Sequence, residues 1–223
     1  MIKNNLISPA ELLTLSDIKN PDVGFLIKLT FYSLVSKGNI KIKRLEVKSN
    51  TRESAFFLFK NDRIQDNLNP HEKVIMSYLN SSKPIPLKQL VYYLSNYLNP
   101  AYRFIFKKYR YESFVLHSLQ LKGLIGKKGI LKKKSYTTQR GVEVKKMIYQ
   151  DHEDIINYFK PTYQNIISLL KLFDLKYEHE NELYKVEKEF NHYIKKGTKR
   201  DFMAFPNIGD NYPEPKNSES ALF

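Results

Sequence analysis

Two stretches of the chain, FYSLVSKGNI at 31–40 and LHSLQLKGLI at 116–125, repeat one pattern. In each stretch, two large apolar residues stand three positions apart, as on one face of a helix, and a Lys-Gly pair follows. Glycine at that point predicts a left-handed helix cap, and the apolar residue two positions later begins a strand. The repeat therefore predicts, twice over, a buried helix, a glycine stop and a β-strand.

The residues around the second copy complete a small helical domain with a β-hairpin. A helix N-terminus is predicted at Asn69, because Pro70 stands at the first helical position and Glu72 at the third. Apolar residues at helical spacing follow within 87–98. We expect, in order, a helix from residue 70, a short strand at Ile85, helices over 87–98 and 100–122, and strands over 124–126 and 130–137 around a turn at 127–129.

This order of elements resembles the winged-helix domain of bacterial transcription regulators. The similarity is strongest at Leu116-x-x-Leu119-x-x-x-Gly123-Leu124-Ile125 and at YTTQRG, residues 136–141, which is similar to the closing strand and Thr-capped helix of that family. It covers roughly residues 69–150. The resemblance implies a third helix and a wing that contact DNA or another protein, since winged helices serve both purposes.

The first copy is less complete. SPAE at 8–11 predicts a capped helix to Leu15, NP at 20–21 opens a longer helix to Lys37, and strands follow over 40–47 and 55–59. A third helix has no room here. The outward positions of the longer helix are expected to be Lys28, Thr30, Tyr32 and Ser33, which carry little charge and favour contact with protein.

A second resemblance covers this part of the chain more weakly. SPAE at 8–11, residues 29–38, FFL at 56–58 and LNPHE at 68–72 are similar to the cytosolic part of a family of bacterial predicted membrane proteins of unknown function. The present sequence contains no segment of about 20 apolar residues, so we expect no membrane span. This resemblance implies a tandem arrangement and gives no information about an activity.

The predicted architecture is α+β and mainly α, with tandem winged-helix-like units followed by a C-terminal helical segment. Leu183, Val186, Phe190 and Ile194 form an apolar stripe that must be buried, and we favour a brace against the units, hence a monomer over a homodimer. The predicted segments are 1–66 for the incomplete first unit, 67–150 for the basic second unit, 151–196 for the C-terminal helices and 197–223 for a mobile tail.

The distribution of basic residues along the chain indicates what kind of partner to expect. The chain has 223 residues and a net charge of +14, and residues 100–150 alone hold 13 basic and 2 acidic residues. Such a block predicts a polyanionic partner, and nucleic acid, DNA more than RNA, is the leading hypothesis. The predicted contact residues are Arg103, Lys107, Lys108, Arg110, Ser113, Gln120, Lys122, Lys127, Lys128, Lys132, Lys133, Lys134 and Arg140. Among them, Ser113 and Gln120 can bond base edges.

Other chemistry has little support in the sequence. The absence of cysteine excludes disulfides, thiolate metal sites and cysteine nucleophiles, and fits a reducing, cytoplasmic location. There is no Walker loop, dinucleotide turn, HExxH or GxSxG, so we expect no enzyme and no cofactor. The cluster DHED at 151–154 is interpreted as the acidic start of a helix and not as a metal site. The alternative function is a scaffold for protein or for an anionic membrane surface. Basic residues dispersed around the domain would favour the scaffold, whereas one continuous positive face would favour nucleic acid.

Overall fold

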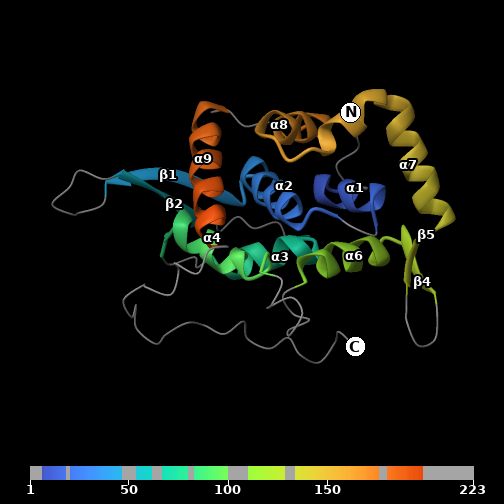
Figure 1. The fold of residues 1–223 in the computed structure, drawn as a ribbon, viewed down its shortest axis with the longest axis horizontal. Coiled ribbons are helices and arrows are strands. Elements are labelled where there is room, and N and C mark those ends of the chain that lie inside the picture. The colour runs from blue at the N-terminus through green and yellow to red at the C-terminus, as the bar shows by residue number, and fades with distance from the viewer. Residues whose placement is uncertain are drawn as a thin grey trace.

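The computed structural model describes residues 7–18, 21–46, 54–61, 67–79, 83–99, 110–128, 134–175 and 180–197 (Figure 1). In chain order the elements are α1 (Pro9–Ser16), α2 (Val23–Ser36), β1 (Ile40–Glu46), β2 (Ser54–Lys60), α3 (Pro70–Ser77), β3 (Ile85–Pro86), α4 (Leu87–Ser95), α6 (Tyr111–Leu121), β4 (Ile125–Lys128), β5 (Lys134–Thr137), α7 (Gln139–Asp151), the 3-10 helix η2 (Glu153–Phe159), α8 (Tyr163–Leu172) and α9 (Glu180–Gly197). The fold is α+β and mainly α, as predicted.

Helices α2 and α6 end in the same way, as the sequence repeat predicts. Gly38 has φ 74° and Gly123 has φ 69°. After α6, the amide of Gly123 donates to the carbonyl of Gln120 and the amide of Leu124 to that of Leu119, both at 2.9 Å. The same two bonds close α2, so both ends are Schellman motifs. The two stretches are therefore equivalent in backbone conformation as well as in sequence.

The start of α2 differs from the prediction. Its N-cap is Asp22, whose carboxylate accepts a 3.0 Å hydrogen bond from the amide of Phe25. The sequence pattern pointed to Asn20, two residues earlier. Asp22 is an equally good capping residue, and the amide that its carboxylate accepts from, that of Phe25, belongs to the first turn of α2.

The strands of the described residues form two separate sheets. β1, β2 and β3 make an antiparallel sheet in that order, whereas β4 and β5 make a two-stranded hairpin. Strand β3 belongs to the predicted 67–150 segment, yet it pairs with β2, placing Ile85 opposite Leu58. The short strand of the later segment thus extends the sheet of the earlier one.

The second hairpin is longer on its first arm than predicted. Lys127 and Lys128 were expected in the turn, but they are strand residues of β4, opposite Ser135 and Lys134 respectively. A cross-strand register that starts at Ile125 and Thr137 keeps pairing through these lysines. The connection between β4 and β5 lies outside the described residues, as do residues 100–109 of the predicted third helix and the predicted tail from residue 198 on.

Helix α2 lies in the middle of the molecule, between α8 and α3 (Figure 1). Lys28, Thr30, Tyr32 and Ser33 were predicted to face outward, and this is wrong, since all four are buried. For two of them, Lys28 and Tyr32, the partner is in the C-terminal segment. The Lys28 ammonium and the Tyr32 hydroxyl both donate to the buried carboxylate of Glu187 in α9, each at 2.7 Å.

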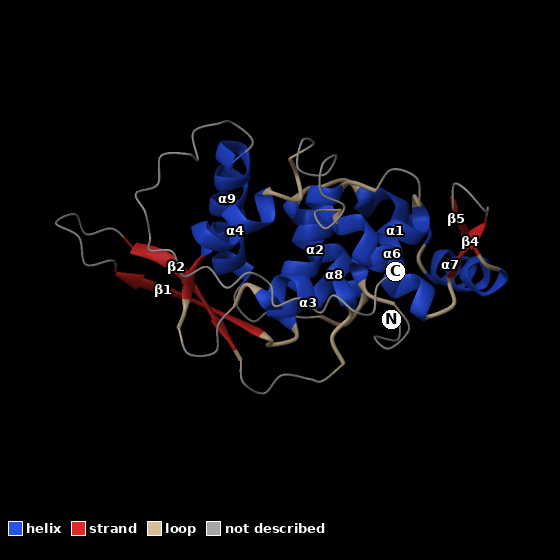
Figure 2. Ribbon diagram, turned by 90° about the horizontal axis from the view of Figure 1, so that it is seen from below, coloured by secondary structure: helices blue, strands red, loops and turns tan. Residues whose placement is uncertain are grey.

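The apolar stripe of α9 is buried within the chain. Leu183, Val186 and Phe190 are inaccessible to solvent and Ile194 is partly buried against the same core. Helix α9 packs mainly on α4, on the side of the β1–β2–β3 sheet that faces the core (Figure 2). The predicted brace is confirmed as packing.

Candidate nucleic-acid interface

The predicted contact residues fall into three groups. Arg103, Lys107, Lys108, Lys132 and Lys133 lie outside the described residues. Arg110, Ser113, Gln120 and Lys122 lie on or beside α6, and Lys127, Lys128, Lys134 and Arg140 lie on the β4–β5 hairpin and the start of α7. The structure therefore brings two of the three groups to one end of the molecule (Figure 1).

One side of α6 is used by the fold. Tyr111, Val115 and Leu119 are buried where the helix packs against α1 and α3. Ser113 and Gln120 are seven residues apart, close to two full turns, and lie on the opposite side, Ser113 exposed and Gln120 half-buried. The residues between them on that side are Leu116 and His117. The outward face of α6 thus has little charge with which to approach a phosphate.

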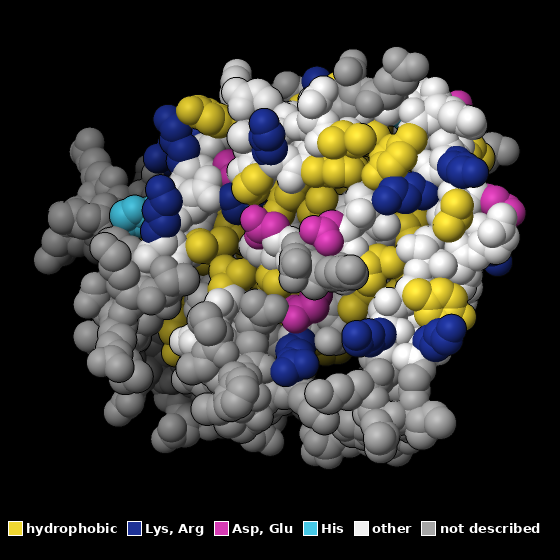
Figure 3. All heavy atoms as spheres, turned by 45° about the vertical axis from the view of Figure 1, so that its right-hand side comes forward, with side chains coloured by type: hydrophobic (Ala, Val, Ile, Leu, Met, Phe, Trp, Pro, Cys, Tyr) yellow, Lys and Arg dark blue, Asp and Glu magenta, His cyan; other side chains and the backbone are white. Residues whose placement is uncertain are grey.

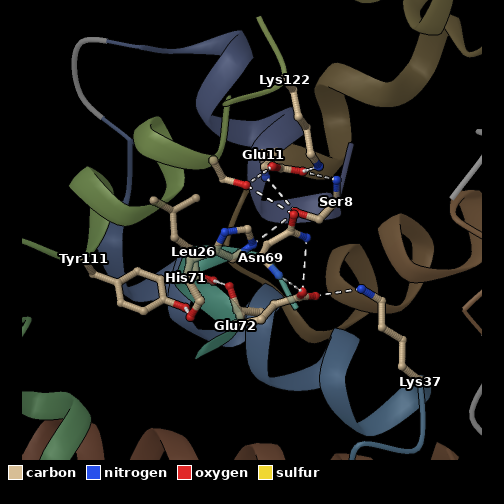
Figure 4. A network of polar contacts seen from close by, with 11 residues as sticks. Ser8, Glu11, Leu26, Lys37, Asn69, His71, Glu72, Tyr111 and Lys122 are labelled. Carbon is tan, nitrogen blue, oxygen red and sulfur yellow. Dashed lines mark hydrogen bonds and ion pairs between the residues drawn. The ribbon is translucent and has the colours of Figure 1, made fainter. Parts of the chain in front are cut away.

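Lys122 uses its charge inside the fold. Its ammonium lies 2.7 Å from Oε2 of Glu11, a carboxylate with no exposed surface (Figure 4). The other oxygen of Glu11 accepts a hydrogen bond from the Ser118 hydroxyl. Glu11 also closes the capping box of α1, accepting from the amide of Ser8. Lys122 therefore joins the end of α6 to the start of α1.

The first repeat makes the reciprocal connection. Lys37, which precedes Gly38 as Lys122 precedes Gly123, lies 2.6 Å from Oε1 of Glu72 at the start of α3. Glu72 closes a capping box with Asn69, as Glu11 does with Ser8 (Figure 4). The lysine in each repeated stretch thus pairs with the helix-capping glutamate that lies upstream of the other stretch.

Two titratable groups at this crossing are shifted. Burial raises the pKa of Glu72, but Lys37, His71 and the hydrogen bonds to the carboxylate outweigh it and leave the pKa below its usual value. Burial is the main reason that the pKa of His71 is lowered. Its Nε2 lies 3.2 Å from the Ser8 hydroxyl, and its Nδ1 has no hydrogen-bond partner among the described residues. His71 is therefore a buried part of this connection.

The β4–β5 hairpin presents a face with both positive charge and an aromatic ring. Lys128 and Lys134 are directly opposite each other, and Gly126 is opposite Tyr136 on the same face. A Cβ atom at Gly126 would lie 2.5 Å from Cζ of Tyr136, so the ring crosses directly over the glycine backbone. Tyr136 nevertheless keeps 48% of its surface exposed. Its outer ring face is open beside the two lysines.

The start of α7 holds this hairpin against α6. The Thr138 hydroxyl caps α7 by accepting from the amide of Gly141, and a Thr-capped helix here is what the winged-helix resemblance implies. A Cβ atom at Gly141 would lie only 2.1 Å from the carbonyl oxygen of Leu124, so α7 begins in direct contact with the backbone before β4. Arg140 is exposed, and its guanidinium lies near Gly123. Arg140 thus extends the basic surface from the hairpin toward the end of α6.

The surface at this end of the molecule is not uniformly positive. In Figure 3, lysine and arginine side chains stand apart from one another, with apolar and acidic side chains between them. Among the described residues of the helices on either side of the hairpin, Leu121 at the end of α6 is 69% exposed and Met147 in α7 is 48% exposed. Dispersed charge of this kind favours the scaffold alternative. It also leaves the β4–β5 hairpin as the candidate contact surface for nucleic acid.

Comparisons with known proteins identify no relative. No family model matches the chain, and neither a curated protein nor a solved structure matches it. The part of the chain that the structure describes contains no helix long and apolar enough to cross a membrane. In the same residues no three histidine or acidic side chains come together as metal ligands would.

Proposed function

We propose that this chain is a non-enzymatic nucleic-acid-binding protein whose β4–β5 hairpin contacts the phosphate backbone. One observation carries the proposal: Lys128 and Lys134 lie directly opposite each other, although like charges at such positions destabilise a hairpin. Within the described residues neither makes an ion pair. An anionic ligand between them would remove the repulsion and release counterions.

The binding is expected to depend on charge more than on base sequence. Lys127 and Arg140 add exposed cations beside the hairpin, whereas the outward face of α6 offers Ser113 and Gln120 as the polar groups for base edges. The winged-helix resemblance makes duplex DNA the first ligand to test. A monomer is the proposed state, because the stripe of α9 is already buried in the chain, and a cytoplasmic location stays a prediction.

The test replaces Lys128 and Lys134 by Gln in the full chain. Fluorescence anisotropy with labelled duplex DNA, at several salt concentrations, should show affinity at low salt reduced by about tenfold or more. The slope of log affinity against log salt should fall by about two units, one for each lost phosphate contact. The matched control is Lys127→Gln, an exposed lysine on the other face of β4, which should change affinity less than the double variant.

Two results would contradict the proposal. One is wild-type protein that shows no salt-sensitive binding to any nucleic acid. The other is a single Lys127→Gln exchange that lowers affinity as much as the double variant, since binding would then follow total charge and not the Lys128–Lys134 face.

The scaffold alternative has its own observation, the exposed Leu121 of α6 and Met147 of α7. Apolar side chains among cations suit a protein partner or an anionic membrane surface. Retention of the wild-type chain on vesicles with anionic lipid, or capture of one specific protein after nuclease treatment, together with no retention on DNA, would favour the scaffold.

A further inference from the structure

The two hairpins carry equivalent residues on equivalent faces. Because Ile40 aligns with Ile125 in the repeat, Lys43 corresponds to Lys128. The cross-strand registers extend this correspondence to the second arms. Phe59 is opposite Lys41 in one hairpin, and Tyr136 is opposite Gly126 in the other, so the two rings occupy the same place. Each hairpin therefore has an aromatic ring and a lysine at matching positions.

The outer face of the β1–β2 hairpin has the chemistry of the proposed site. Alternation along β1 puts Ile42 on the core side, and Lys41 and Lys43 on the outer side with Phe57 and Phe59 of β2. Both lysines are exposed and both rings are half-buried. The Lys43 ammonium lies 5.4 Å from the centroid of the Phe59 ring. The Lys43 ammonium therefore lies over one face of the Phe59 ring, so this cation and this ring belong to one surface.

This face is left uncovered by the described helices. Helices α4 and α9 lie on the core side of the sheet, where the Leu58 and Ile40 side chains are buried (Figure 2). Within the described residues Lys41 and Lys43 make no ion pair. In Figures 1 and 2 the β1–β2 and β4–β5 hairpins lie at opposite ends of the molecule. The chain therefore presents two separated surfaces of the same kind.

We infer that the outer face of β1–β2 is a second nucleic-acid contact surface and that one single strand spans both hairpins. Lysines alone would suit any polyanion, but the paired rings add a requirement for flat, stackable groups. Bases in a duplex are already stacked on one another, whereas those of a single strand are free to stack on Phe59 and Tyr136 while phosphates meet Lys43 and Lys128. This inference rests on the proposed function and specifies its ligand.

The experiment compares two matched double variants of the full chain, Lys43→Gln with Phe59→Leu and Lys128→Gln with Tyr136→Leu. Leucine keeps an apolar side chain at each ring position and removes the π-face. Anisotropy titrations use a short and a long oligothymidylate, and a duplex of matched length. Lys60→Gln, on the core face of β2, is the control for charge, and circular dichroism verifies that each variant is folded.

Each double variant is expected to weaken binding of the long single strand by about tenfold or more, with less effect on the duplex. Wild-type affinity should rise when the strand is long enough to reach both hairpins, because the second contact is then intramolecular. Either double variant should remove that rise. Lys60→Gln should leave it in place.

The possible failures are distinguishable. If the Lys128 and Tyr136 variant loses binding and the Lys43 and Phe59 variant binds as the wild type does, the second surface is refuted and the proposed function stands. If neither variant changes binding, both ideas fail. A Lys43 and Phe59 variant that loses binding to anionic vesicles, but not to oligonucleotides, would also refute the inference and assign this face to a membrane.

Discussion

Replacing Lys122 by Met tests whether the crossed ion pairs hold the two repeats together. The exchange keeps a flexible side chain of similar length and leaves Glu11, which has no exposed surface, without its cation. Removing one partner of a buried pair costs about 3–5 kcal/mol. Glu11 retains hydrogen bonds from Ser8 and Ser118, so we expect the lower end, about 3 kcal/mol.

For a chain of this size about 3 kcal/mol corresponds to a fall in Tm of about 6–12 °C. The free energy of unfolding is measured by urea denaturation at neutral pH. Lys146→Met, on the exposed side of α7, removes a lysine that has no ion pair within the described residues and should change stability little. The double variant of Lys122→Met with Glu11→Gln removes both charges and should recover much of the loss. A Lys122→Met chain as stable as Lys146→Met would refute the role given to the crossed pair.

Two further predictions concern single sites. Gly123→Val should cost more than about 1 kcal/mol in urea, because φ at this position is 69° and a β-branched residue is strained there, whereas Gly123→Asn should cost less; equal losses would show that steric contact and not backbone conformation sets the requirement. His71 has a folded-state pKa below its unfolded value of 6.5, so the unfolded state binds more protons as the pH falls below that value and stability should decline. The urea midpoint of wild type should therefore drop between about pH 7.5 and about pH 5.5, and a His71→Gln chain with an equally steep drop would contradict this assignment.

Features that depend on neighbours within a few residues were predictable from the sequence. The glycine stops at Gly38 and Gly123 and the cap at Ser8 all lie where the local patterns place them. Each is determined by hydrogen bonds that span three to five residues. A local pattern therefore contains most of the information that such a feature needs.

Features that depend on distant partners were not predictable in the same way. Lys28 and Tyr32, two of the four residues assigned to the outward face of α2, instead pair with the buried Glu187, more than 150 residues later. Helical periodicity separates two faces but cannot tell which elements will cover the second one. The same holds for β3, since Ile85 signals a strand and does not specify that Leu58 is its neighbour.

The crossed ion pairs lie between these two cases, because the sequence did contain a signal for them. Lys37 and Lys122 occupy the same place before the repeated glycine, and Glu11 and Glu72 occupy the same place in two capping boxes. Two equivalent cations and two equivalent anions allow pairing within a repeat or between repeats. The sequence cannot distinguish these arrangements, and the structure has the pairing between repeats.

The pairing between repeats has a consequence for binding. Lys37 and Lys122, the lysines before the two glycines, neutralise buried carboxylates and are therefore committed to the fold. The lysine five positions after each glycine, Lys43 or Lys128, lies on the outward face of a hairpin. One repeated segment thus supplies a cation that fixes the two copies to each other and a cation that is exposed at the far end of each. Loss of the first kind should lower stability, and loss of the second kind should lower affinity while leaving stability nearly unchanged.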